Sequence, residues 1–104
     1  MTGGAMSADQ LLEELRVVLD PELGVNIVDL GLVYRAEASA ERVEVDFTLT
    51  YPGCPIGPEL KGEIEQVLKD VTGIEDVEAR LVWEPLWGPE RMTEEARLSL
   101  GYPI

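Results

Sequence analysis

The chain of 104 residues contains no histidine and only one cysteine. The lack of histidine excludes nucleophile pairs in which imidazole activates serine or cysteine, and it excludes the usual imidazole-based zinc sites. One cysteine cannot form a disulfide within the chain, and no Cys-x-x-Cys redox pair is present. This cysteine usage is typical of a reducing compartment, so we expect a cytoplasmic protein.

Basic residues are also scarce: 8 lysines and arginines stand against 21 aspartates and glutamates, which gives a net charge of −13. Such a charge repels phosphate backbones and anionic lipids, so we expect neither nucleic acid nor a membrane as a partner. No apolar run approaches the roughly 18 residues that a membrane span needs. An acidic surface suits basic protein partners or cations, although a solvated surface explains the charge more simply.

The length predicts one domain that is large enough for a core of its own. Residues 1–6 are small and rich in glycine. We expect a disordered leader over residues 1–6 and a single domain over residues 7–104.

Hydrophobic periodicity predicts the order helix, strand, strand, helix, strand, short helix. The predicted elements cover residues 8–19, 32–36, 43–49, 56–71, 77–82 and 94–100. A hairpin followed by a strand–helix–strand crossover forms a small mixed sheet. We therefore expect an α/β (α+β) fold with the order α-β-β-α-β-(α). It is a two-layer sandwich in which a three-stranded sheet, second strand central, carries the helices on one face.

Cys54 lies between the second strand and the second helix. Pro55 suits the first position of a helix, which places Cys54 at or near the N-cap. The helix dipole and the free N–H groups of the first turn favour thiolate, the form that acts as a nucleophile or metal ligand. A buried cysteine that only caps the helix is the alternative, and the pattern alone leaves both open.

Other polar residues flank this cysteine or lie in the turn after the first helix. Gly53 permits a sharp bend beside the thiol, and Thr48 and Thr50 bring two hydroxyls to the end of the strand. Asp20 and Glu22 offer oxygen donors that suit a hard or borderline metal. Helix capping and turn chemistry explain the two carboxylates equally well.

A single thiolate cannot hold an iron–sulfur cluster, which normally takes four ligands, most of them thiolates. A second copy of the chain, a client protein or added carboxylates would have to complete a transient site. Peroxide reduction is another reaction of one activated cysteine. The spacing from Thr50 to Cys54, however, differs from the peroxiredoxin pattern.

Three motifs stand in order along the chain: Asp20 to Tyr34, then Thr48-Leu49-Thr50 with Pro52-Gly53-Cys54-Pro55, then Trp83 to Trp87 with Met92 and Leu100-Gly101-Tyr102. Together they resemble the PaaD-like and SufT-like domain family, long known as domain of unknown function 59. The resemblance extends over residues 9–102, and the fold it implies is that of other cluster-assembly domains.

The resemblance implies a role in assembling iron–sulfur clusters or delivering them to apo-protein clients, with scaffold and carrier proteins as further partners and a homodimer as one arrangement. The protein would be a maturation factor rather than an enzyme with turnover, and a cluster would be bound transiently, with none held permanently. Cys54 would be the catalytic thiol and the metal contact. The residues lining the same site would be Asp20, Glu22, Thr48, Thr50 and Gly53.

Two alternatives stay open. In the first, the protein is a cluster-free adaptor in which Cys54 is only a cap and the loop of Trp83 and Trp87 docks the client. In the second, it is an accessory subunit of a multicomponent oxygenase related to phenylacetate degradation. Members of that branch carry a cysteine-rich C-terminal extension, whereas no second cysteine follows here, so we expect no zinc-binding tail.

Overall fold

The computed structural model describes residues 6–50, 53 and 55–101. In chain order its elements are α1 (Ala8–Leu15), β1 (Val33–Ala38), β2 (Val43–Phe47), α2 (Gly57–Thr72), β3 (Val77–Leu81), the 3-10 helix η1 (Pro89–Arg91) and α3 (Glu94–Leu100). The predicted order of helices and strands is confirmed, and η1 is an addition to it.

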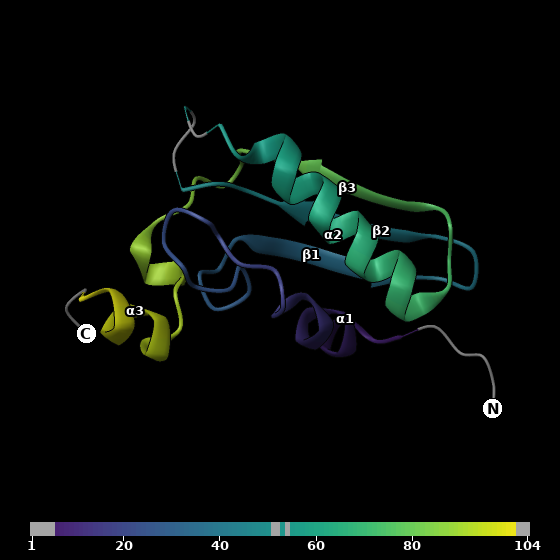
Figure 1. Cartoon of the computed structure of the whole chain (residues 1–104), viewed down its shortest axis with the longest axis horizontal. Helices are drawn as coiled ribbons and strands as arrows, with labels where there is room; N and C mark the ends of the chain where they lie inside the picture. The colour runs from purple at the N-terminus through teal and green to yellow at the C-terminus, as the bar shows by residue number, and fades with distance from the viewer. Residues whose placement is uncertain (1–5, 51–52, 54, 102–104) are drawn as a thin grey trace.

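The sheet has the strand order β1-β2-β3, with β2 in the centre as predicted. β1 runs antiparallel to β2, and β3 runs parallel to it, so the sheet is mixed. The parallel register pairs Val43 with Val77 and Phe47 with Leu81. Because β2 and β3 run in the same direction, the loops that follow them leave the sheet at the same end (Figure 1).

Helices α1 and α2 contact each other and the sheet, and together they cover one of its faces (Figure 1). This is the expected two-layer sandwich. The core between the layers contains the fully buried side chains Leu11, Leu15, Val43, Val45, Phe47, Leu60, Ile64 and Leu68. They recur at every second residue in β2 and at every fourth in the helices, the spacings that bring side chains to one face. Each such burial stabilises the fold by about 1.5–3 kcal/mol.

Helix α1 ends at Leu15, four residues before the predicted end. Val18 and Leu19 belong instead to a short hairpin, in which Leu19 bridges Asn26 and the Ile27 N–H donates to the Val18 carbonyl at 3.0 Å. Val18 is buried in this hairpin. Its apolar side chain therefore extends the spacing of the helix in the sequence, although the helix has already ended.

Local chemistry sets several element ends as predicted. Ser7 and Gln10 form the capping box of α1, and the Thr93 side chain accepts the N–H that caps α3. Gly73 ends α2 with a positive φ of 74°. Within the described residues, no helix is both long and apolar enough to cross a membrane.

Candidate functional site

Three loops lie at the end of the sheet where β2 and β3 finish (Figure 1). Their described parts are residues 16–32, then 48–50, 53 and 55–56 of the 48–56 loop, and 82–93. The Thr48 N–H donates to the Leu32 carbonyl at 2.8 Å, and the Val82 N–H donates to the Phe47 carbonyl at 2.8 Å. The base of the 48–56 loop is therefore held on both sides. We call this region the loop end.

Trp87 joins the 82–93 loop to the 16–32 loop. Its indole N–H donates to the Leu30 carbonyl at 2.7 Å, and its ring packs partly buried against the core. Trp83 packs against the core as well. The tryptophans therefore cover the core, while Leu86 between them keeps 69% of its surface exposed.

Gly31 and Arg91 approach each other so closely that only glycine fits at residue 31. Gly31 has a φ of +77°, and a Cβ there would lie 2.3 Å from the Arg91 carbonyl oxygen. The Arg91 guanidinium lies 4.6 Å from the centroid of the Tyr34 ring, a cation–π contact. Burial raises the pKa of Tyr34, and its hydroxyl donates to the Pro85 carbonyl at 2.8 Å. These contacts anchor the 82–93 loop.

Asp29 is nearly buried and joins three segments. Its carboxylate accepts two hydrogen bonds from Arg16, at 2.8 and 3.2 Å, and one from the Asn26 amide at 3.0 Å. Its carbonyl accepts the Thr93 N–H at 2.8 Å. Asp29, which belongs to the motif from Asp20 to Tyr34, therefore has a structural role.

Asp20 is 2% exposed and organises its own turn. Its Oδ1 accepts the N–H groups of Glu22 at 2.8 Å and Leu23 at 3.2 Å, and its carbonyl accepts the Gly24 N–H at 2.7 Å. This is the turn chemistry that the sequence left open beside a binding role. Glu22 is exposed in the same turn.

Thr48 follows directly after β2 and is fully buried. Its hydroxyl has no hydrogen-bond partner among the residues that the structure describes. A buried polar group without a partner costs about 1–3 kcal/mol. Residues 51, 52 and 54 of the adjoining loop lie outside the described part of the chain, so the role of this hydroxyl stays a prediction. Thr50 is half-buried and Gly53 is exposed, farther along the same loop.

Cys54 lies outside the described residues, so its roles as catalytic thiol and metal contact stay predictions. The helix beside it starts later than predicted, because α2 begins at Gly57. Its N-cap is Ile56, without a side-chain hydrogen bond, and Pro58 rather than Pro55 lies in the first turn. Ile56 is buried against the core, which fixes the start of the helix after it. The cap itself is therefore Ile56, and the placement of Cys54 near the cap stays a prediction.

The loops that carry the other predicted site residues have their described parts at the loop end (Figure 1). In the part of the chain that the structure describes, no group of three or more histidine, cysteine, aspartate and glutamate side chains is placed to hold a metal ion. Sequence reasoning missed the anchors Gly31, Tyr34 and Arg91. The only signal was the number of turn formers around them, which predicts a loop but not its contacts.

A cavity of about 650 Å³ opens beside the loop end on the face of the sheet that the helices leave uncovered. Its charged lining residues are Arg35, Asp46, Glu84 and Arg91. Arg35 and Asp46 are hydrogen-bonded to each other at 3.2 Å. Two positive and two negative side chains balance, so the cavity has no net preference for an anion or a cation.

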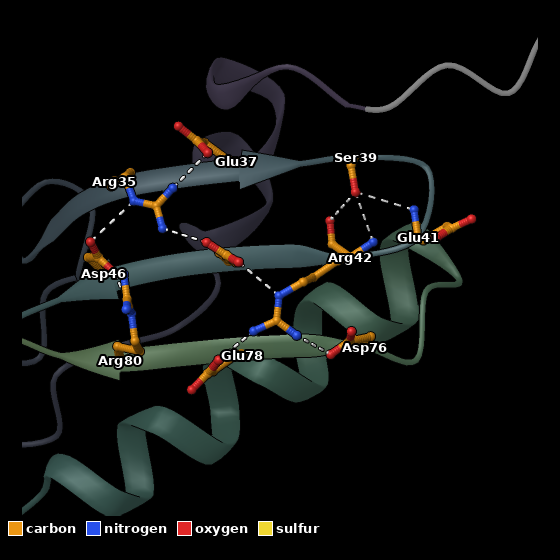
Figure 2. Close-up of polar contacts among 10 residues, drawn as sticks. Arg35, Glu37, Ser39, Glu41, Arg42, Asp46, Asp76, Glu78 and Arg80 are labelled. Atoms are coloured by element: carbon orange, nitrogen blue, oxygen red, sulfur yellow. Dashed lines mark hydrogen bonds and ion pairs between the residues drawn. The ribbon is translucent and has the colours of Figure 1, made fainter.

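The uncovered face of the sheet carries ion pairs rather than apolar side chains (Figure 2). Arg35 donates to Glu44 at 2.7 Å, and Arg42 donates to Glu44 at 2.8 Å and to Asp76 at 2.6 Å. The hydrogen bonds from Arg35 and Arg42 lower the pKa of Glu44 to about 2. Water can therefore solvate this face, and no helix layer is needed to cover it.

The sequence model of the iron–sulfur cluster assembly protein family matches residues 8–81. The chain belongs to this family. The Fe-S protein maturation auxiliary factor SufT of Staphylococcus aureus is 44% identical over 86 residues, which cover 82% of this chain and 98% of that protein. The Fe-S protein maturation auxiliary factor YitW of Bacillus subtilis is 37% identical over 94 residues, 89% of this chain and 92% of the relative.

A solved structure supports the same assignment. The crystal structure of a domain of unknown function 59 from Bacillus anthracis matches this fold with a TM-score of 0.85 and 37% sequence identity, covering 92% of each chain. The fold expected from the resemblance and the membership in this family are both confirmed.

Proposed function

We propose that this protein is an iron–sulfur maturation factor that helps to assemble clusters or deliver them to apo-protein clients, in the cytoplasm. The proposal is supported by the family match over residues 8–81, which includes the 48–56 loop. Similarity to two maturation auxiliary factors over 82% and 89% of the chain adds to it. The cluster is cargo that passes through the protein.

Cys54 supplies the thiolate in this proposal. One cysteine and no histidine cannot provide the four ligands that a cluster takes. The remaining ligands come from a carrier protein, from the client or from a second copy of the chain. Such an incomplete set favours transfer, because a client with several thiolates binds the cluster more completely than this chain does.

The other candidate residues shape the surroundings of that thiol. The buried Thr48 hydroxyl, which has no partner among the described residues, is a donor available to a group that arrives at the loop end. Asp20 keeps the neighbouring turn closed through its bonds to Glu22 and Leu23. Thr50 and Gly53 set the path of the loop toward Cys54.

A cluster-free adaptor is the second candidate, and Leu86 favours it. This side chain is 69% exposed in a loop that is otherwise anchored, which suits contact with a client. A role as an accessory oxygenase subunit is the weaker alternative, since both relatives described above are maturation factors.

Anaerobic cluster transfer tests the proposal. The protein is loaded with iron and sulfide and mixed with an apo-protein that has a vacant four-cysteine site. Iron per chain, visible absorbance and the rate of client activation are followed. We expect Cys54→Ser to abolish both loading and acceleration, whereas Ser99→Ala, on the exposed surface of α3, keeps them. Equal acceleration by Cys54→Ser and the unaltered chain would contradict the proposed thiol.

The same assay distinguishes the cluster-free adaptor from the cluster-transfer factor. If client binding persists in Cys54→Ser but is lost in Leu86→Asp, the protein acts through its surface and not through a bound cluster. If Leu86→Asp transfers clusters normally, the adaptor candidate fails.

A further inference from the structure

The β3 edge of the sheet is closed by side chains from α2. Glu65 Oε2 accepts the Ala79 N–H at 2.9 Å, and Lys61 Nζ donates to the Ala79 carbonyl at 2.9 Å. Lys61 and Glu65 also form an ion pair with each other. This arrangement, which we call the edge clasp, occupies the backbone groups that another strand would need.

The β1 edge has no such cover. β2 is its neighbour in the sheet, and β1 lies at the opposite edge from β3. Among residues 6–50, 53 and 55–101, no backbone hydrogen bond joins β1 to a segment other than β2. Every second residue of an edge strand turns its N–H and carbonyl away from the sheet, so β1 presents a free row of both.

A groove of about 320 Å³ runs along this free edge. One wall consists of five consecutive residues, Val33 to Glu37, and the other of Ala8 and Leu12 from α1. Leu12 is only partly buried and packs against the core. The groove thus combines a strand edge with a small apolar wall, the two features that bind an extended peptide as an added strand.

We propose that an extended segment of a partner protein binds in this groove and adds a fourth strand beside β1. Its inward side chains are small or apolar, because they meet Ala8 and Leu12. Its outward side chains are basic, because they meet Glu37, whose carboxylate pairs with Arg35 at 2.7 Å yet leaves the side chain 68% exposed. The net charge of −13 attracts a basic segment over longer distances as well.

A second copy of this chain suits the groove less well. Two copies that pair through antiparallel β1 strands keep their helices on the same face of the joined sheet, so each α1 would lie over the junction. Figure 2 shows the N-terminal helix extending past the outer edge of β1, into the space that the second helix would need. Two chains of charge −13 also repel each other.

This inference does not depend on Cys54 or on cluster transfer, so its test is separate from that of the proposed function. Isotope-labelled protein is titrated with an end-blocked heptapeptide of alternating lysine and valine, followed by amide chemical shifts and hydrogen exchange. We expect shifts and slowed exchange in β1 but not in β3. Cys54→Ser is expected to bind the peptide equally well.

Backbone methylation of the peptide distinguishes strand addition from charge attraction. Two versions carry N-methyl groups either on the lysines or on the valines, with the same side chains and charge. Alternate residues of a strand face the same neighbour, so one version must lose its hydrogen bonds to β1 while the other keeps them. Equal binding of both versions would overturn the proposal.

Variants locate the site. Ala8→Trp fills the groove from an exposed position and is expected to abolish binding. Glu37→Lys is expected to weaken binding about two- to fivefold, whereas Glu63→Lys, on the exposed surface of α2, makes the same charge change away from the groove. Equal losses from these two lysine variants would overturn the proposal. Concentration-dependent shifts of β1 without peptide would assign the edge to a second copy and overturn the choice of occupant.

Discussion

Glu65 accepts the backbone N–H of Ala79 at 2.9 Å, so a helix side chain takes the place of a neighbouring strand. Glu65→Ala leaves that N–H without its acceptor, and we expect the free energy of unfolding to fall by about 1–3 kcal/mol. Urea denaturation measures the loss. Glu63→Ala, exposed on the same helix, is the control and is expected to change stability by less than about 0.5 kcal/mol. Equal stability of the two variants would show that the clasp contributes nothing.

Gly31 and Gly24 both have positive φ angles, 77° and 72°, but different surroundings. A Cβ at Gly31 meets the Arg91 backbone, whereas a Cβ at Gly24 meets nothing within 4 Å. Gly24→Ala is expected to lower the free energy of unfolding by about 1–2 kcal/mol, because the alanine is held in a left-handed backbone conformation. Gly31→Ala is expected to cost clearly more, because the 82–93 loop must also move. Thermal unfolding of both variants measures the difference in stability. Similar losses of stability would mean that the Arg91 backbone moves away from residue 31 at no cost in free energy.

Thr48→Val removes the buried hydroxyl that lacks a partner among the described residues. Because no described hydrogen bond is lost, we expect unchanged or slightly higher stability in urea denaturation. Thr72→Val is the control, since that hydroxyl donates to the Leu68 carbonyl at 2.6 Å and its loss is expected to destabilise by about 1 kcal/mol. If the hydroxyl serves cluster transfer, Thr48→Val slows client activation despite its stability. Full transfer activity would leave Thr48 without a functional role.

Glu44 links stability to pH. Its pKa is lowered from 4.5 to about 2 by hydrogen bonds from Arg35 and Arg42. A carboxylate with a lowered pKa contributes stability that is complete above the unfolded pKa and is lost as the pH falls toward the folded one. We therefore expect stability to drop between about pH 4.5 and pH 2. Glu44→Gln should show a smaller drop in urea midpoint over this range, and an unchanged drop would assign the effect to other carboxylates.

The sequence predicts the order of elements and several of their ends because those depend on neighbouring residues. Ser7, Gly73 and Thr93 act on backbone groups within a few positions, and β2 shows its buried face by simple alternation. The end of α1 and the start of α2 differ from the prediction because one residue there suits two structures. Val18 is buried in a hairpin as it would be in a helix, and Pro55 suits a turn as well as a first helical turn.

The candidate site is less accessible from the sequence. Motifs indicate which loops carry it, and the fold confirms that these loops leave the same end of the sheet. The contacts that join them are not visible in any local pattern. Trp87 bonds to the Leu30 carbonyl, 57 residues away, and the partner of an indole N–H is set by tertiary packing alone. Asp20 shows the same limit, since only the folded chain reveals that its carboxylate is buried and accepts N–H groups of its own turn.

The bond from Trp87 to Leu30 also constrains when the site can form during synthesis. A ribosome makes the chain from the N-terminus, so the 16–32 and 48–56 loops emerge well before their anchor in the 82–93 loop. β2 likewise lacks its parallel neighbour until β3 has left the exit tunnel. Contacts between residues distant in sequence form late because the intervening chain must first be closed into a loop. The three loops of the candidate site therefore reach their final arrangement only after the 82–93 loop has left the ribosome.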